Sequence, residues 1–204
     1  MARTRNIKNY DNAKSRLLAI GVELIRSDSF SAIGINDVLK KSEIPRGSFY
    51  HYFENKQAFG LEVAQFYHAQ QMSDAQNILR NESITPLQRL KKFFRQARKA
   101  FSKRSFADGC LMCNLSTELA DTNATFQTVL KTQWNELAAE IALCVAQMDK
   151  ADIGMAHLTD KEVADWLLNA WGGALARMKA EGNDTPLQLF EKSIFKKRIN
   201  TEEA

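Results

Sequence analysis

The 204-residue chain has few of the residues that interrupt regular structure, with 9 Gly and 3 Pro. This scarcity excludes a collagen-like, linker-rich or low-complexity protein. No stretch reaches the about 18 consecutive apolar residues of a membrane helix, so we expect no membrane partner. The N-terminus carries charge but no apolar segment behind it, unlike a secretory signal, and we therefore expect a cytoplasmic protein.

Cysteine is also rare, and the three Cys residues do not make a disulfide framework. Cys110 and Cys113 stand at CxxC spacing, whereas Cys144 lies in an apolar stretch and is expected to be a small core residue. A zinc site would need two more ligands, and the three scattered His show no ligand spacing. We therefore expect no metal and no cofactor.

Positive charge is concentrated near the N-terminus. Residues 1–60 hold 10 Lys and Arg against 6 Asp and Glu, whereas residues 61–204 hold 18 of each kind. A basic N-terminal module on a neutral body suits a polyanionic partner. Charge alone leaves a chance fluctuation open as the alternative.

Apolar residues recur at helical spacing along the chain, and no alternating run between turn signals indicates a strand. Thr159 and Glu162 have the spacing of a capping box at a helix start. We predict an all-α fold of about nine helices. The expected helices span residues 11–27, 34–42, 45–52, 55–80, 85–102, 110–119, 125–148, 159–181 and 186–195.

The two short helices expected at residues 34–42 and 45–52 have the size and spacing of a helix-turn-helix. The second, or recognition, helix of this motif lies in the DNA major groove with its N-terminal residues nearest the bases and phosphates. Arg46 can bind guanine or a phosphate in a forked geometry. The other candidate contacts are Ser48, Tyr50, His51, Tyr52 and Lys56, together with the basic arm residues Arg3, Arg5, Lys8 and Lys14.

The aromatic residues of the second helix have an alternative interpretation as core residues. Phe49 and Phe53 are expected in the core, because a three-helix head of this size needs large side chains to pack. Tyr50 and Tyr52 keep both interpretations.

Residues 11–60, and the segment IPRGSFYHYFENKQAFG above all, resemble the DNA-binding head of the TetR family of transcriptional regulators. The resemblance implies a helix-turn-helix domain at residues 1–55 and a helical regulatory and dimerisation domain at residues 56–204. It also implies a non-enzymatic homodimer, joined through its last two helices, on a palindromic double-stranded DNA operator. The matching residues are Val38, Ile44, Gly47, Tyr50, Phe53 and Lys56.

Three positions depart from the family pattern. Glu43 stands where a small residue or glycine is usual, Tyr52 where His is common, and Gly34 where Ser or Thr often caps the helix. We expect these departures to alter the operator sequence but not the fold.

Cys110 lies at an expected helix start, where backbone N–H groups and the helix dipole stabilise a thiolate. The preceding helix has eight basic residues and no acidic residue between positions 83 and 107. Basic residues that face Cys110 would lower its pKa further, and a solvated helix face is the alternative. The residues alone leave two possibilities: a sensor pair in which Cys113 is resolving or inert, or a buried structural cysteine.

The segments GCLMCNLSTELAD and AWGGALARMKAE resemble the branch of the TetR family that includes the N-ethylmaleimide-reductase repressor and the acrylate-responsive repressor. In the first of these, a cysteine at the GCL position senses electrophiles and reactive chlorine, with a lysine on the eighth helix as its partner. The resemblance places Cys110 and Lys179 at these positions. Lys179 also fits a surface lysine at a helix end. The acrylate-type relatives have the same cysteine, so this cysteine alone does not decide the inducer.

Three function classes follow. The first is a repressor that an electrophile or oxidant releases from DNA by modifying Cys110, and the second is a repressor with a reversible small-molecule inducer. The third, a CxxC thiol enzyme, lacks the expected strand context, so we expect no enzyme. Candidate residues of a ligand pocket, or alternatively of the core, are Trp134, Trp171, Phe126 and Met178.

Overall fold

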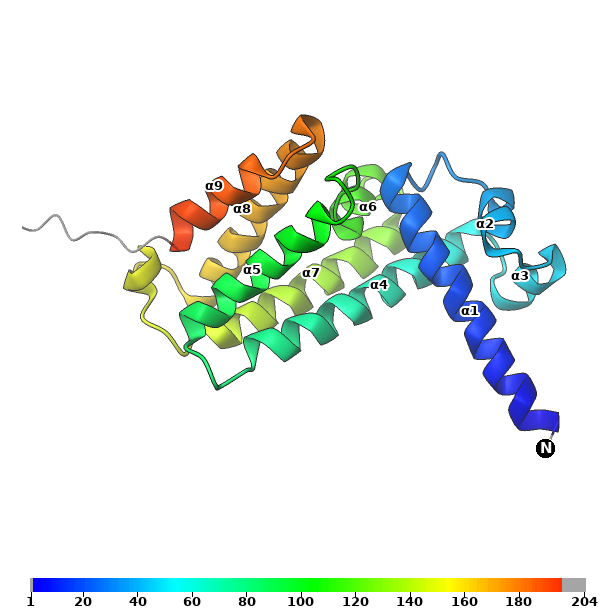
Figure 1. The fold of residues 1–204 in the computed structure, drawn as a ribbon, viewed down its shortest axis with the longest axis horizontal. Coiled ribbons are helices and arrows are strands. Elements are labelled where there is room, and N and C mark those ends of the chain that lie inside the picture. Colours follow the sequence, from blue (N-terminus) through cyan, green and yellow to red (C-terminus); the bar gives the residue numbers. More distant parts are fainter. Residues whose placement is uncertain (1, 196–204) are drawn as a thin grey trace, which may run out of the picture. The chain divides into compact units, whose positions relative to one another are not determined.

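The computed structural model describes residues 2–195, of which residues 2–12 are described by their backbone alone. This part of the chain forms nine α-helices, one short 3-10 helix and no strand, which confirms the predicted all-α fold. The helices are α1 (Ala2–Ser27), α2 (Ile35–Ser42), α3 (Arg46–Tyr52), α4 (Lys56–Leu79), α5 (Pro86–Ser102), α6 (Leu111–Leu119), α7 (Ala124–Val145), η1 (Lys150–Ile153), α8 (Asp160–Glu181) and α9 (Thr185–Phe195) (Figure 1).

The helices group into two compact units. The head unit comprises residues 1–71 and 110–131, which include α1 to α3, most of α4, α6 and the start of α7. The body unit comprises residues 72–109 and 132–204, with α5, most of α7, α8 and α9. The predicted domain boundary after residue 55 follows the family resemblance rather than compactness, so it stays a prediction.

Aromatic rings form the centre of the head unit. Phe49, Phe53 and Phe59 are buried, and their ring centroids lie 5.0 to 5.3 Å apart. Such tilted ring pairs stabilise a core beyond the area they bury. Phe49 and Phe53 are therefore core residues, as predicted, and they fix α3 and the start of α4 against each other.

A close approach of helix and loop requires the glycine at position 60 of α4. A Cβ atom at Gly60 would lie 2.3 Å from Cε2 of Phe30 and 3.0 Å from Cζ of Phe126. Phe30 and Phe126 also pack on each other, with their centroids 5.4 Å apart. The loop after α1 is thereby seated on α4 and α7 within the head unit.

The turn between α2 and α3 uses backbone geometry that the sequence shows only in part. Glu43 caps α2 in the left-handed region with φ of 55°, which is a position that glycine normally takes. Pro45 is the N-cap of α3 and Arg46 its first residue, so Pro45 lies just outside the helical turn in which we predicted it. At the start of α2, Asp37 accepts a hydrogen bond from the Gly34 backbone N–H at 2.7 Å.

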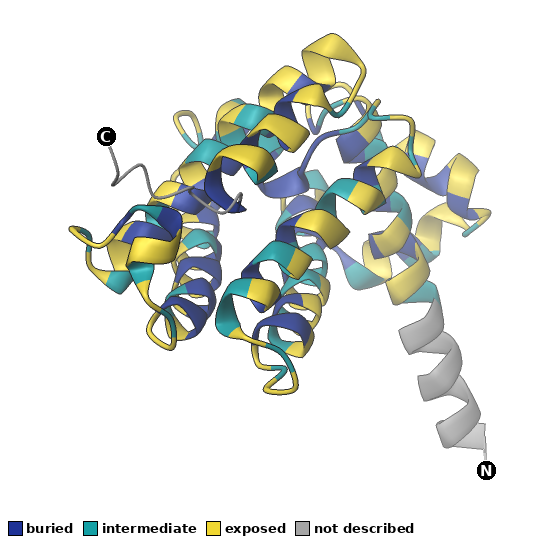
Figure 2. Ribbon diagram, turned by 60° about the vertical axis from the view of Figure 1, so that its left-hand side comes forward, coloured by how far each residue is buried: buried dark blue, intermediate teal, exposed yellow. Residues whose placement is uncertain are grey.

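Two elements differ from the predictions. Helix α1 begins near residue 2, so the predicted basic arm is the N-terminal part of that helix rather than a separate segment. The 3-10 helix η1 was not predicted, because four residues are too few to display helical periodicity. Figure 2 shows that the helices carry buried residues on one side and exposed residues on the other.

An aromatic cluster joins three helices of the body unit. Phe94 on α5 packs against Trp171 on α8 and Phe190 on α9, with centroids 5.2 and 4.9 Å away. The predicted capping box is confirmed, because Thr159 and Glu162 exchange backbone-to-side-chain hydrogen bonds of 2.8 and 3.2 Å. No helix in the described part of the chain is long and apolar enough to cross a membrane.

Candidate nucleic-acid interface and thiol site

Helix α3 turns one side toward the core and the other toward solvent. Phe49 is buried, whereas Arg46 and His51 are exposed and Tyr50 keeps 47% of its surface accessible. The guanidinium carbon of Arg46 lies 6.0 Å from the Tyr50 ring centroid. An exposed cation beside an exposed phenol can bind phosphate and base edges without rearrangement of the core.

The other predicted DNA contacts on α3 are less accessible. Ser48 and Tyr52 are half-buried, and the Tyr52 ring lies 5.8 Å from that of His51. Gly47, next to Arg46, has open space around it, since a Cβ atom there would meet nothing within 4 Å. Packing within the described protein therefore gives no reason for a glycine at this position.

Two predicted DNA-contacting lysines have partners inside the head unit. Lys56 donates a hydrogen bond of 3.2 Å to the Ser31 carbonyl, and its Nζ lies 4.8 Å from the Phe30 ring centroid. Lys14 forms an ion pair with Glu62. These lysines brace the head unit, and their contact with DNA stays a prediction. The side chain of Arg5, like those of Arg3 and Lys8, lies outside the described residues.

Cys110 is the N-cap residue of α6 and is only 5% exposed. Its Sγ accepts a hydrogen bond from the Tyr67 hydroxyl on α4 at 3.7 Å and another from the Cys113 thiol. All three cysteines of the chain are free thiols. The structure thus brings the two CxxC sulfurs together in one polar cluster, in which Cys110 is buried and Cys113 and Tyr67 are half-buried.

The surroundings make Cys110 the more acidic thiol of the pair. Hydrogen bonds from the Cys113 side chain, from the backbone and from Tyr67 lower the pKa of Cys110, and they outweigh the opposing effect of burial. The same hydrogen bond, together with burial, raises the pKa of Cys113. These groups belong to the head unit. A contribution from the basic residues of α5, in the body unit, stays a prediction.

A buried arginine adjoins the phenol of this cluster. Arg26 on α1 is buried, and its guanidinium carbon lies 5.7 Å from the Tyr67 ring centroid. The pKa of Tyr67 is raised by burial and by the neighbouring thiol, although the Arg26 charge acts in the opposite direction. Tyr67 therefore stays a protonated hydrogen-bond donor to Cys110 over the physiological pH range.

Helix α6 is also bonded directly to the loop that precedes the helix-turn-helix. Glu118 accepts hydrogen bonds from the backbone N–H groups of Phe30 and Ser31 at 2.9 and 2.6 Å. One turn earlier, Asn114 donates to the Arg26 carbonyl at 3.5 Å. Cys110, Asn114 and Glu118 are spaced four residues apart and so lie along one side of α6.

The pKa of Glu118 reflects this position. Burial acts to raise it, but hydrogen bonds from Ser31 and Phe30 and the charge of Lys56 bring it below the usual value for a glutamate. The carboxylate is therefore ionised when it holds the loop. Sequence reasoning identified none of Arg26, Tyr67, Asn114 and Glu118, because contacts across the fold leave no spacing signal.

The remaining predicted sensor residue and the third cysteine lie in the body unit. Lys179 is exposed in the last turn of α8, and its link to Cys110 stays a prediction. Cys144 is buried as predicted, and its thiol donates to the Pro86 carbonyl at 3.5 Å. Burial raises the pKa of Cys144 to about 11.

The predicted pocket residues occupy different surroundings. Phe126 is buried in the head unit, Trp171 and Met178 are buried in the body unit, and Trp134 is half-buried. A ligand site formed by these residues stays a prediction.

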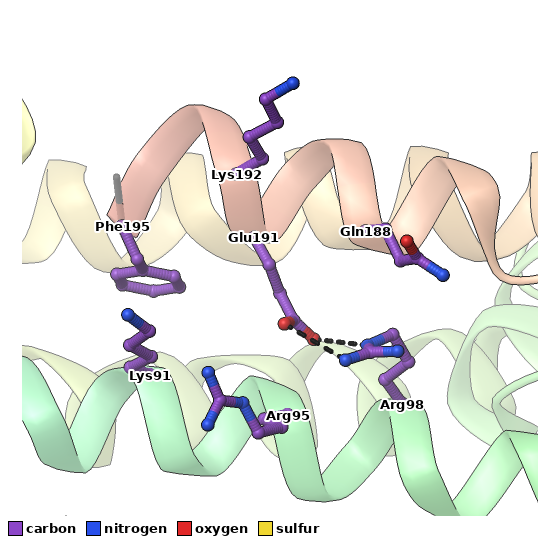
Figure 3. Close-up of a pocket in the computed structure, with 7 residues that line it drawn as sticks. All are labelled: Lys91, Arg95, Arg98, Gln188, Glu191, Lys192 and Phe195. Carbon is purple, nitrogen blue, oxygen red and sulfur yellow. Dashed lines mark hydrogen bonds and ion pairs between the residues drawn. The ribbon is translucent and has the colours of Figure 1, made fainter. Parts of the chain in front are cut away.

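A basic groove lies between α5 and α9 in the body unit (Figure 3). It has a volume of about 410 Å³, and none of the four predicted pocket residues lines it. Arg98 is bound to Glu191 and Asp184 at 2.7 Å each, whereas Lys91 and Arg95 point from α5 into the groove. The groove is lined by Lys91, Arg95, Arg98, Gln188, Glu191, Lys192 and Phe195.

Two family models match this chain. The model described as "Bacterial regulatory proteins, tetR family" matches residues 17–63, and the one described as "Tetracyclin repressor-like, C-terminal domain" matches residues 86–194. The second match alone covers more than half of the chain. The protein belongs to the TetR family of bacterial regulatory proteins, as its head segment predicted.

Individual relatives cover much of the chain. The transcriptional regulator AcuR of Cereibacter sphaeroides is 30% identical over 94% of this chain and 88% of its own. The HTH-type transcriptional repressor NemR of Escherichia coli is 29% identical over 58% of this chain and 60% of its own, which confirms the branch that the motifs indicated. The crystal structure of a regulatory protein TetR from Rhodobacter sphaeroides is 28% identical and superposes with a TM-score of 0.84, covering 89% and 96% of the two chains.

Proposed function

We propose that this protein is a DNA-binding transcriptional repressor of the TetR family whose α3 helix reads a palindromic operator. The observation that carries the proposal is the exposed surface of Arg46, Tyr50 and His51 on a short helix whose opposite side is locked by Phe49. Ser48, Tyr52, Lys56, Arg5 and Lys14 complete the proposed contact set. Arg46 supplies the charge nearest the start of the recognition helix.

A salt titration of operator binding tests this assignment. Arg46→Ala should weaken binding to the DNA upstream of the protein's own gene. The slope of log affinity against log salt concentration should become shallower by about one per lost phosphate contact. Lys131→Ala is the matched control, because Lys131 is exposed on α7 and removes the same charge. Equal binding by the two variants would contradict the assignment.

The repressor acts as a homodimer in this proposal. Large apolar side chains are exposed on the last two helices, where Trp166 on α8 is 43% and Leu189 on α9 is 58% accessible. Exposed apolar groups of this size are typical of an interface. Sedimentation should show a dimer for the wild type and a monomer for a Trp166→Glu, Leu189→Glu double variant, and an unchanged dimer would place the interface elsewhere.

The operator is released when a reactive small molecule modifies Cys110. Support comes from its lowered pKa, since the thiolate is the reactive form, and from the hydrogen bonds that its sulfur accepts from Tyr67 and Cys113. Its 5% exposure favours a small oxidant such as hypochlorous acid over a bulky quinone or maleimide. By resemblance, Lys179 is the alternative partner of the oxidised sulfur.

A mobility-shift assay with oxidant separates this mechanism from reversible induction. Hypochlorite should release the wild type and the Cys144→Ser control, whereas Cys110→Ser should stay bound. Release of the Cys110→Ser variant at the same oxidant concentration would rule out Cys110 as the sensor. Binding by both proteins without any response would point to the reversible alternative.

The reversible alternative has one specific observation in its favour, the groove between α5 and α9. Lys91 and Arg95 point into it without an acidic partner among the described residues, so its ligand would be an anion of small size. An added small carboxylate ligand should raise the melting temperature of the wild type and of Lys92→Ala, because Lys92 lies on the same helix but outside the groove. Arg95→Ala should lose this stabilisation, and equal stabilisation of all three proteins would exclude the groove.

A further inference from the structure

We infer that oxidation of the thiol site ends in a disulfide between Cys110 and Cys113, formed within the first turn of α6, with Cys113 as the resolving thiol. The inference rests on the proposed function, in which Cys110 is the residue that the oxidant attacks. It adds the identity of the second sulfur, the reversibility of the signal and the route by which the signal reaches the DNA-binding head.

The geometry favours this pair. Cys110 is the N-cap and Cys113 the third helical residue, and the intervening turn is closed by a 3.0 Å hydrogen bond from Asn114 N–H to the Cys110 carbonyl. Residues three apart on a helix have Cβ atoms about 5–6 Å apart. A disulfide needs a separation of about 3.5–4.5 Å, so the turn must tighten by about 1–2 Å. The two thiols are already joined by a hydrogen bond.

The two cysteines take different parts in this reaction, because Cys110 is the more acidic thiol and Cys113 keeps its proton. The Cys110 thiolate attacks the chlorine of hypochlorous acid, which gives a sulfenyl chloride and hydroxide. The Cys113 sulfur then attacks the Cys110 sulfur, chloride leaves, and the hydroxide accepts the Cys113 proton. Each sulfur has given up one electron, and the products are one disulfide, one chloride and one water.

Cys113 is well placed to trap the oxidised sulfur. It lies in the first turn of the helix that Cys110 caps, and its thiol already forms a hydrogen bond with the Cys110 sulfur. Hypochlorous acid is also small enough for a site in which Cys110 is buried. The inference therefore assigns no part in the reversible response to Lys179.

The disulfide would change the contacts of α6 with α1, α4 and the loop before α2. Cys110 Sγ would turn from Tyr67 toward Cys113, and the hydroxyl of the half-buried Tyr67 would lose its acceptor. Asn114 and Glu118, on the same side of α6, hold the end of α1 and the loop before α2. Tightening of the first turn of α6 therefore acts on α1, the helix that positions the helix-turn-helix.

The test is a mass measurement paired with operator binding on the full-length protein. After a limiting dose of hypochlorite, non-reducing peptide mapping should find a Cys110–Cys113 disulfide in the wild type, Lys179→Arg and Cys144→Ser. Operator affinity should decrease by about 5- to 150-fold, which is the usual range of allosteric coupling. Dithiothreitol should restore binding in all three proteins.

The variants at position 113 give the decisive contrast. Cys113→Ser and Cys113→Ala should still react at Cys110. Further oxidation of the Cys110 sulfur in these variants should then cause a loss of operator binding that dithiothreitol does not reverse. Full recovery of both variants, or no Cys110–Cys113 peptide in a released wild type, would overturn the inference while Cys110 remained the sensor. Release of Cys110→Ser by the same dose would instead overturn the proposed function itself.

Discussion

Replacement of Glu118 by glutamine tests whether α6 holds the DNA-binding head. The carboxylate accepts hydrogen bonds of 2.9 and 2.6 Å from two backbone N–H groups of the loop after α1. Hydrogen bonds to a charged group contribute about 1.5–3 kcal/mol each when well formed. Because Glu118 is half-buried and glutamine keeps one acceptor oxygen, we expect Glu118→Gln to lower the free energy of unfolding by about 1–2 kcal/mol.

The effect should depend on pH in a defined direction. The pKa of Glu118 is lowered in the folded protein, so its contribution is fully present above the unfolded pKa of about 4.3 and is lost as the pH falls through the folded value. The difference between wild type and Glu118→Gln in urea unfolding should therefore be full at about pH 7 and should decrease as the pH is lowered below about 4.

The control is Glu54→Gln, since Glu54 is an exposed glutamate of the same unit. This variant should unfold like the wild type at both pH values. Operator affinity should fall in Glu118→Gln and not in Glu54→Gln, because only Glu118 binds the loop before α2. Identical unfolding free energies of Glu118→Gln and wild type near neutral pH would refute the reasoning.

Three glycine-related substitutions give further expectations. Glu43→Gly should raise the free energy of unfolding by about 0.5–1 kcal/mol in urea titrations, because the left-handed φ is relieved and the exposed ion pair with Arg16 contributes little; a loss of stability would contradict this. Gly60→Ala should destabilise by about 1–3 kcal/mol, since its Cβ would lie 2.3 Å from Phe30, and a normal melting temperature would show that the ring can move away. Gly47→Ala should leave thermal stability unchanged or raise it by up to about 1 kcal/mol, yet weaken operator binding in a mobility-shift assay; unchanged affinity would mean that DNA does not approach this backbone.

The features that sequence predicted are those encoded by local spacing. Periodic apolar residues set the helices, and the Thr159–Glu162 pair marked the start of α8 because both partners of a capping box lie within one turn. Phe49 and Phe53 were assigned to the core because a small head has few large side chains to choose from. The placement of Cys110 at a helix start likewise followed from nearby residues.

The features that sequence missed depend on distant contacts. Glu118 lies 88 residues from Phe30 in the chain, and an isolated glutamate on a helix gives no sign that it binds a remote loop. Tyr67 lies 43 residues from Cys110, and its aromatic ring had the same periodicity as the core residues around it. Lys56 was selected for its charge, its place at a helix start and its match to the family motif, and Lys14 for its charge, whereas their partners Ser31 and Glu62 are set by contacts across the fold.

The buried thiol of Cys144 gives the chain an internal kinetic reference. With a pKa of about 11, only about one Cys144 side chain in ten thousand is a thiolate at pH 7. Alkylation by iodoacetamide would therefore be very slow at position 144, and the reactions of the two CxxC thiols, Cys110 and Cys113, can be compared with it in one and the same molecule. The ratio of these rates cancels errors in reagent and protein concentration, so changes at α6 can be followed in the natural sequence without a cysteine-free background.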